Sequence, residues 1–187
     1  MRSALLVGIR AWAFTWGAVL VNGLPARAQV PGGVFAATVT GAVEARPRGE
    51  AAFGAVAQGG GAATFSITLT SPAQDGAVVL TARSGERPQP GRSYRISDSG
   101  APGTFSALYL AGPAERPAGA FRATSGTLEI LGADAGRIEA RFRLEARGFL
   151  AAEPENERRT VAMTGWFNAE SQAVAMSAMS DDDARLP

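Results

Sequence analysis

The chain has 187 residues, of which 46% are hydrophobic and 19% charged, and its formal net charge is +1. It contains no histidine and no cysteine, and all 18 basic residues are arginine, so lysine is missing as well. These gaps exclude a Ser-His-Asp triad, a thiol nucleophile, zinc bound by cysteine or histidine, and a Schiff base. Carboxylate chemistry, serine chemistry without an obvious base, and metal binding by oxygen ligands remain. Because the sequence offers no convincing pair of carboxylates and no ligand spacing of a metal loop, we expect no enzyme, no cofactor and no metal site.

Residues 1–28 have the features of a secretory signal peptide. Arg2 gives a positive start, the run from Ala11 to Leu24 is apolar and uncharged, and Ala26-Arg27-Ala28 has the small-x-small form of a cleavage site. The apolar run is shorter than the roughly 20 residues of a membrane-spanning helix, and no apolar run in the rest of the chain is long enough to span a membrane. We expect cleavage before Gln29 and a periplasmic or secreted protein without a transmembrane segment. A retained N-terminal anchor is the alternative.

The mature chain, residues 29–187, has the length of one domain. Cleavage would remove three of the 18 arginines and none of the 17 acidic residues, which gives a formal charge of −2. This balance argues against nucleic acid as a partner, because binding to phosphates needs a clear excess of positive charge.

Apolar and polar residues alternate with the period of a β-strand along most of the mature chain. The clearest example is residues 65–70, where Phe65, Ile67 and Leu69 alternate with serine and threonine. The linkers are too short for crossover helices. The pattern predicts an all-β domain over residues 29–179, either a single antiparallel β-sandwich or a β-barrel of about 9–10 strands. We place the strands at 33–43, 50–57, 63–70, 76–83, 92–97, 103–111, 119–131, 137–149, 158–169 and, as a tenth, 172–178. Residues 180–187 are expected to form a disordered acidic tail.

The strongest local prediction is a hairpin over residues 119–149. Its loop, Asp134-Ala135-Gly136, fits a three-residue turn with Gly136 in the left-handed conformation. The resulting register pairs Ala133 with Arg137, Ile130 with Ala140, Leu128 with Phe142 and Glu129 with Arg141. Opposite charges then meet on the outer face, while apolar residues meet on the core face.

A register one step tighter would place Glu129 opposite Glu139. The two carboxyl groups would then be close enough to resemble the catalytic pair of a retaining glycosidase. The same register also opposes like charges on an open face, so we favour the first one. Turn chemistry similarly accounts for Asp98 and Asp134, since neither has the ligand spacing of a calcium loop.

The outer face of residues 137–147 carries four arginines and two glutamates. This cationic stripe is a candidate site for an anionic surface such as an acidic polysaccharide or a lipid headgroup. A solvated face that pairs across strands is the alternative interpretation. Trp166 is expected to point outward, where it could stack on a sugar or anchor a partner, or simply cover the sheet. The candidate ligand or partner residues are Arg137, Arg141, Arg143, Arg147 and Trp166.

Four segments carry a resemblance: Phe121–Ile130, Ile138–Phe142, Met163–Phe167 and the turn Pro90–Tyr94. Together they resemble small exported bacterial β-domains of unknown function. In that pattern a Ser-Gly-Thr strand leads through a turn to an Ile-x-Gly-x-Phe strand, and a Gly-x-Phe strand closes the domain. Ala140 stands where the pattern has glycine. The resemblance covers about half of the mature chain and implies export and an antiparallel β fold, but no activity.

The sequence thus predicts an exported non-enzymatic β domain with a binding or structural role at the cell envelope. Its partner would be a protein, a glycan or a lipid. A β-barrel that carries a small apolar ligand is the first alternative, and a carboxylate-dependent hydrolase is the second. A large internal cavity would favour the carrier, whereas a filled core would favour an interaction module.

Overall fold

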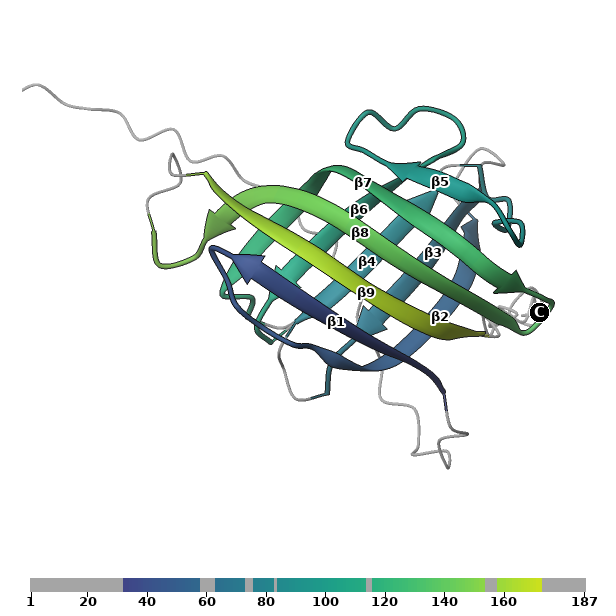
Figure 1. The fold of residues 1–187 in the computed structure, drawn as a ribbon, viewed down its shortest axis with the longest axis horizontal. Coiled ribbons are helices and arrows are strands. Elements are labelled where there is room, and N and C mark those ends of the chain that lie inside the picture. The colour runs from purple at the N-terminus through teal and green to yellow at the C-terminus, as the bar shows by residue number, and fades with distance from the viewer. Residues whose placement is uncertain are drawn as a thin grey trace, which may run out of the picture. The chain divides into compact units, whose positions relative to one another are not determined.

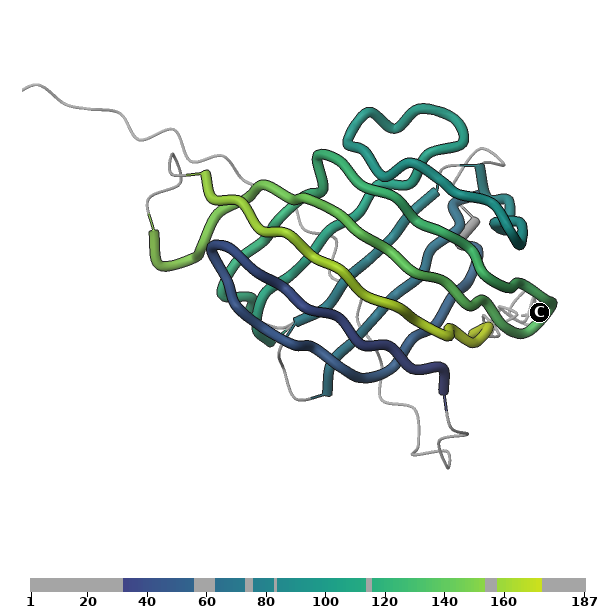
Figure 2. The backbone as a smooth tube through the Cα atoms, in the orientation of Figure 1, coloured from purple at the N-terminus to yellow at the C-terminus, as the bar shows by residue number. Residues whose placement is uncertain are grey.

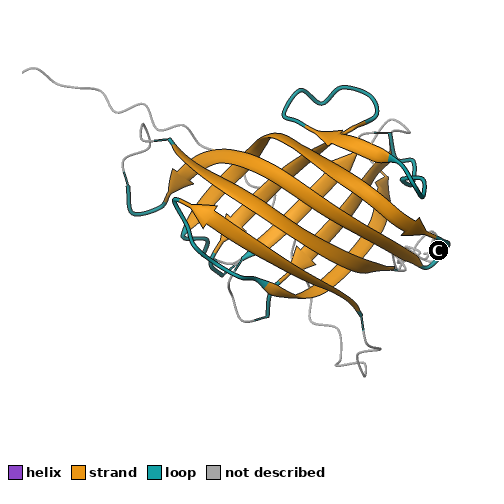
Figure 3. Cartoon of the chain, viewed as in Figure 1, coloured by secondary structure: helices purple, strands orange, loops and turns teal. Residues whose placement is uncertain are grey.

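The computed structural model describes residues 32–57, 63–72, 76–82, 84–113, 116–153 and 158–172. They form nine strands and, within these ranges, no helix (Figure 3). The strands are β1 (Gly33–Gly41), β2 (Arg48–Ala57), β3 (Ala63–Thr70), β4 (Ala77–Ala82), β5 (Ser93–Ile96), β6 (Thr104–Ala111), β7 (Gly119–Ala133), β8 (Arg137–Leu150) and β9 (Arg159–Ser171). Each differs from the expected bounds by at most two residues, so the all-β prediction is confirmed. The expected signal peptide, the acidic tail and nearly all of the tenth strand lie outside the described residues.

The nine strands form a single sheet in the order β1-β2-β3-β4-β6-β5-β7-β8-β9. The sheet closes into a barrel because β1 pairs with β9 as well as with β2. Figure 1 shows β1, β9, β8 and β7 side by side on the near wall. Most pairings are antiparallel, as expected, and two short ones are parallel, between β5 and β6 and between β2 and β9. No helix within the described ranges is long and apolar enough to cross a membrane.

Inward-pointing side chains fill the barrel. A cavity that admitted water would leave part of its lining accessible, yet many of these side chains have no exposed surface at all. Ring contacts link neighbouring strands in this core: Phe53 lies 5.7 Å from Phe65 between ring centres, Tyr109 stacks on Phe121 at 6.0 Å, and Phe142 lies 6.3 Å from Phe167. The fully enclosed residues include Ile67, Leu69, Leu80, Ile96, Phe121, Leu128, Ile130, Ile138, Val161, Met163 and Phe167.

Arg87, in the segment between β4 and β5, contacts the turn between β7 and β8. Its guanidinium donates hydrogen bonds to the carbonyl oxygens of Asp134 and, at 2.8 Å, Ala135. The same group lies 4.8 Å from the centre of the Phe53 ring, a cation–π contact. The contacts join this segment to the turn between β7 and β8.

The β7–β8 hairpin has the predicted register in its middle and a different one at its turn. Glu129 lies opposite Arg141, as predicted. The apolar pairs on either side, Leu128 with Phe142 and Ile130 with Ala140, also have the predicted register. The pairing of Ala133 with Arg137 is wrong, because a bulge at Leu131 shifts the register and Ala133 pairs with Ile138. Gly136 is also not in the left-handed conformation. Instead, the Asp134 carboxylate accepts hydrogen bonds from the backbone N–H groups of Gly136 and Arg137, at 2.9 and 2.8 Å, and these stabilise the turn.

A second bulge, at Thr124, changes which residues of β7 face outward. Before it, Phe121 and Ala123 are buried and Arg122 is exposed. After it the parity reverses, so that Leu128 and Ile130 are the buried residues. The extra residue therefore lets both halves of β7 direct apolar side chains into the barrel. Figure 2 shows β8 running between β7 and β9.

Candidate functional site

The four arginines predicted on β8 all face outward. Two of them lie beside acidic residues of neighbouring strands. Arg137 Nη2 is 3.3 Å from Glu170 Oε1, and Arg141 lies opposite Glu129. Arg143, the third, lies between Thr127 and Thr164. At this end of the stripe, opposite charges therefore lie across from each other on neighbouring strands.

At the other end of β8, two arginines occupy opposite positions on neighbouring strands. Arg147 lies directly opposite Arg122 on β7, and Arg158, the residue before β9, adds a third guanidinium. We call Arg122, Arg147 and Arg158 the arginine cluster. None of them forms an ion pair with a carboxylate in the described part of the chain. Like charges directly opposite on neighbouring strands are destabilising, so this pairing has a cost to the fold.

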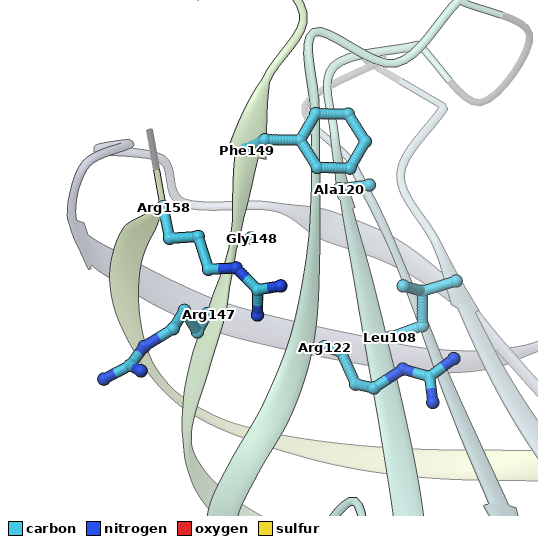
Figure 4. Close-up of a pocket in the computed structure, with 7 residues that line it drawn as sticks. All are labelled: Leu108, Ala120, Arg122, Arg147, Gly148, Phe149 and Arg158. Carbon is cyan, nitrogen blue, oxygen red and sulfur yellow. The ribbon is translucent and has the colours of Figure 1, made fainter. Parts of the chain in front are cut away.

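The arginine cluster surrounds a surface hollow of about 370 Å³. Ala120 and Gly148 form its floor, where β7 and β8 lie so close that a side chain on Gly148 would collide with the Ala120 carbonyl oxygen. Leu108 on β6 and Phe149 on β8 line the same hollow and are 37% and 47% exposed. In Figure 4 the Arg158 side chain extends toward β7, the Arg122 guanidinium lies beside Leu108, and Arg147 projects the opposite way. The site thus combines positive charge with exposed apolar surface.

Two acidic side chains of the described residues lie near this site in sequence. Glu145 is on the same face of β8, opposite Ser125 and Ala162. Glu153 is held by Arg159, whose Nε and Nη2 donate to the two carboxylate oxygens at 2.8 and 2.9 Å. That hydrogen bonding, together with the charge of Arg159, lowers the pKa of Glu153. Glu153 is therefore committed to Arg159 and does not neutralise the arginine cluster.

The Glu153–Arg159 pair predicts a pH-dependent difference between the protein and its Glu153→Gln variant. Because the pKa of Glu153 is lower folded than unfolded, the pair stabilises the fold above the ordinary pKa of 4.5. This contribution disappears as the pH falls through the lowered value. We expect the variant to be slightly less stable at pH 7, since the pair is exposed, and equal to the parent in acid. Urea unfolding of both proteins between pH 7 and pH 3 tests this, and a constant difference would contradict it.

Trp166 points outward and is 48% exposed, as predicted. It lies opposite Arg141 on β8 and Ala36 on β1, and Ala36 in turn lies opposite Arg48 on β2. Trp166 and Arg48 line a separate shallow hollow of about 260 Å³. The structure therefore brings Trp166 next to Arg141 but not next to Arg147, which pairs with Thr160.

The acidic candidates do not form a catalytic pair. Glu129 lies opposite Arg141, and Glu139 lies opposite Gly132 and Asn168, so the tighter register is not the one observed. Asp134 serves the β7–β8 turn. The described ranges hold no group of three or more acidic residues placed to bind a metal ion.

Comparisons of the chain with protein-family models, with curated proteins and with solved structures each found no match. The interpretation of the site therefore depends on its own geometry.

The sequence identified Arg147 but missed Arg122, Arg158, Leu108 and Phe149. The signal for Arg122 lies in the parity of β7, because the apolar residues change from odd numbers at Phe121 to even numbers at Leu128. A strand with one buried face can do this only with an extra residue in between. If Thr124 is taken as the extra residue, the register of β7 with β8 places Arg122 opposite Arg147. Leu108 and Arg158 belong to other hairpins, so local counting could not connect them to this site.

Proposed function

We propose that the protein is a non-enzymatic binding domain of the cell envelope. It is exported to the periplasm or secreted, and it holds an anionic component through the arginine cluster. The observation that carries this proposal is the direct opposition of Arg122 and Arg147 without a carboxylate partner among the described residues. An anionic ligand would turn this repulsion into attraction, because arginine binds carboxylate and phosphate oxygens with two parallel hydrogen bonds.

Two further observations support a binding role over the alternatives. The barrel interior is filled by side chains such as Phe121, Ile130 and Phe167, which leaves little room there for a carried apolar ligand. The carboxylates of Glu129 and Glu139 are not opposite each other, so they do not form the pair on which the hydrolase alternative depended. The apolar run and cleavage motif of residues 1–28 support export.

Replacing either member of the opposed pair should stabilise the fold while weakening binding. We expect Arg122→Gln and Arg147→Gln to raise the free energy of unfolding by about 0.2–1 kcal/mol, because each removes a like-charge pair. Both variants should bind inorganic polyphosphate and polygalacturonate more weakly than the parent. Urea unfolding and isothermal titration calorimetry at low salt measure the two effects.

Arg141→Gln is the matched control, because Arg141 is on the same face of β8 but lies opposite Glu129. Its loss should lower stability slightly and leave polyanion binding nearly unchanged. If the Arg122 and Arg147 variants lose stability, or if they bind both polyanions as the parent does, the proposed function is wrong.

A further inference from the structure

The arginine cluster differs from Arg87 and Arg92, which line another surface hollow. Arg87 donates to two backbone carbonyls and covers the Phe53 ring. Arg92 donates to the Gln89 side chain and lies 5.6 Å from the centre of the Tyr94 ring. These guanidinium groups serve the fold. Arg122 and Arg147 instead lie opposite each other in the register of adjacent strands, on the outer face of the sheet. Figure 4 shows Arg158 and Arg122 extending along the hollow, with Arg147 directed the other way.

Apolar side chains are exposed at the same place. Leu108 is the cross-strand neighbour of Arg122, and Phe149 follows Arg147 by two residues on the same face of β8. Beyond Phe149, Ala151 and Ala152 are also exposed. By contrast, the outward positions of β3 are serine and threonine. A soluble anion would need only the guanidinium groups, so the adjoining apolar side chains call for a ligand with an apolar part.

From this combination we infer that the site docks on a bilayer that contains anionic phospholipid. The inference rests on the proposed function and names its ligand class. The arginine cluster binds headgroup phosphates, while Leu108 and Phe149 enter the boundary between headgroups and acyl chains, where aromatic side chains are favoured. Attraction of basic side chains to an anionic membrane surface then adds to the burial of the two apolar ones.

The charge distribution fits docking in one orientation. Cleavage at residue 28 would leave a formal charge of −2, so the chain as a whole is not drawn to an anionic surface. Near the site, Glu153 is paired with Arg159, and Glu145 lies on the same face two residues before Arg147. The positive charge is therefore concentrated at the C-terminal end of β8. It would orient the protein with this part of the barrel surface toward the lipid.

The test compares binding of the purified chain to two kinds of vesicle, phosphatidylcholine alone and phosphatidylcholine mixed with phosphatidylglycerol. We expect co-sedimentation only with the vesicles that contain phosphatidylglycerol, and weaker binding as salt is added. The double variant Leu108→Thr with Phe149→Thr keeps residues suited to strands and should lose vesicle binding by about tenfold or more. It should bind polyphosphate as the parent does, because its arginines are intact.

Leu131→Thr is the matched control. Leu131 is 40% exposed on β7 and is also apolar, but it lies near the opposite end of the hairpin, so this variant should bind vesicles normally. If the double variant sediments with vesicles like the parent, the membrane inference is wrong. Binding to polyphosphate without binding to vesicles overturns the membrane inference and leaves the proposed function standing. Binding to neither overturns both.

Discussion

Replacing Phe167 by alanine will lower the free energy of unfolding by about 3–5 kcal/mol, the usual cost of removing a buried aromatic ring. Phe167 is fully enclosed, and its ring lies 6.3 Å from that of Phe142. It stands in β9 opposite Ala140 on one side and Phe35 on the other. Because the pairing of β9 with β1 closes the sheet, the ring packs at the seam of the barrel. The small Ala140 offers no bulk to fill the space that its loss would leave.

Trp166→Ala is the control for this prediction, one residue away on the opposite face of β9. Trp166 is 48% exposed, so its loss should cost less than about 1 kcal/mol despite its larger ring. Equilibrium urea unfolding of both variants gives the comparison. Equal losses would show that β9 does not alternate between the core and the outer face as described.

Alternation was sufficient to predict the strands because each has one face in the core and one in solvent. β3, for example, begins and ends at the residues expected from Phe65, Ile67 and Leu69. Alternation does not identify the partner of a strand. β5 pairs with β7 and lies in parallel beside β6, and β1 closes on β9 across most of the chain. Such contacts between distant segments have no local signal in turn residues or periodicity.

The hairpin shows how a correct prediction can result from two errors that cancel. The pairing of Glu129 with Arg141 follows from a turn that sets Ala133 opposite Arg137 and from a strand without bulges. In the structure Ala133 lies opposite Ile138, and the bulge at Leu131 adds one residue to β7, so the register in the middle is the same. No such cancellation occurs beyond Thr124. The opposition of Arg122 and Arg147, which defines the candidate site, was therefore missed.

Deleting Thr124 will leave a chain that still forms the barrel. Thr124 is the extra residue that lets Phe121 and Leu128, which have opposite parity, both face the interior. Without it, these two residues are an even number of positions apart, so an unbroken β7 directs both of them inward. Arg122 and Glu129 then stay on the outer face. The deletion removes the bulge without burying a charge, so the loss of stability should be smaller than that of Phe167→Ala.

Deletion of Leu131 tests the same kind of change at the second bulge, where it should be tolerated. Leu131 is 40% exposed, and only Gly132, Ala133 and the turn lie beyond it in the hairpin. Its removal leaves the core residues of β7 in place and keeps Ala133 opposite Ile138, so the turn does not change. Circular dichroism and urea unfolding should show a folded protein for both deletions. If the Thr124 deletion does not fold, Thr124 is not the extra residue that sets the faces of β7. The position of Arg122 beside Arg147 would then lack its explanation, and the arginine cluster its structural basis.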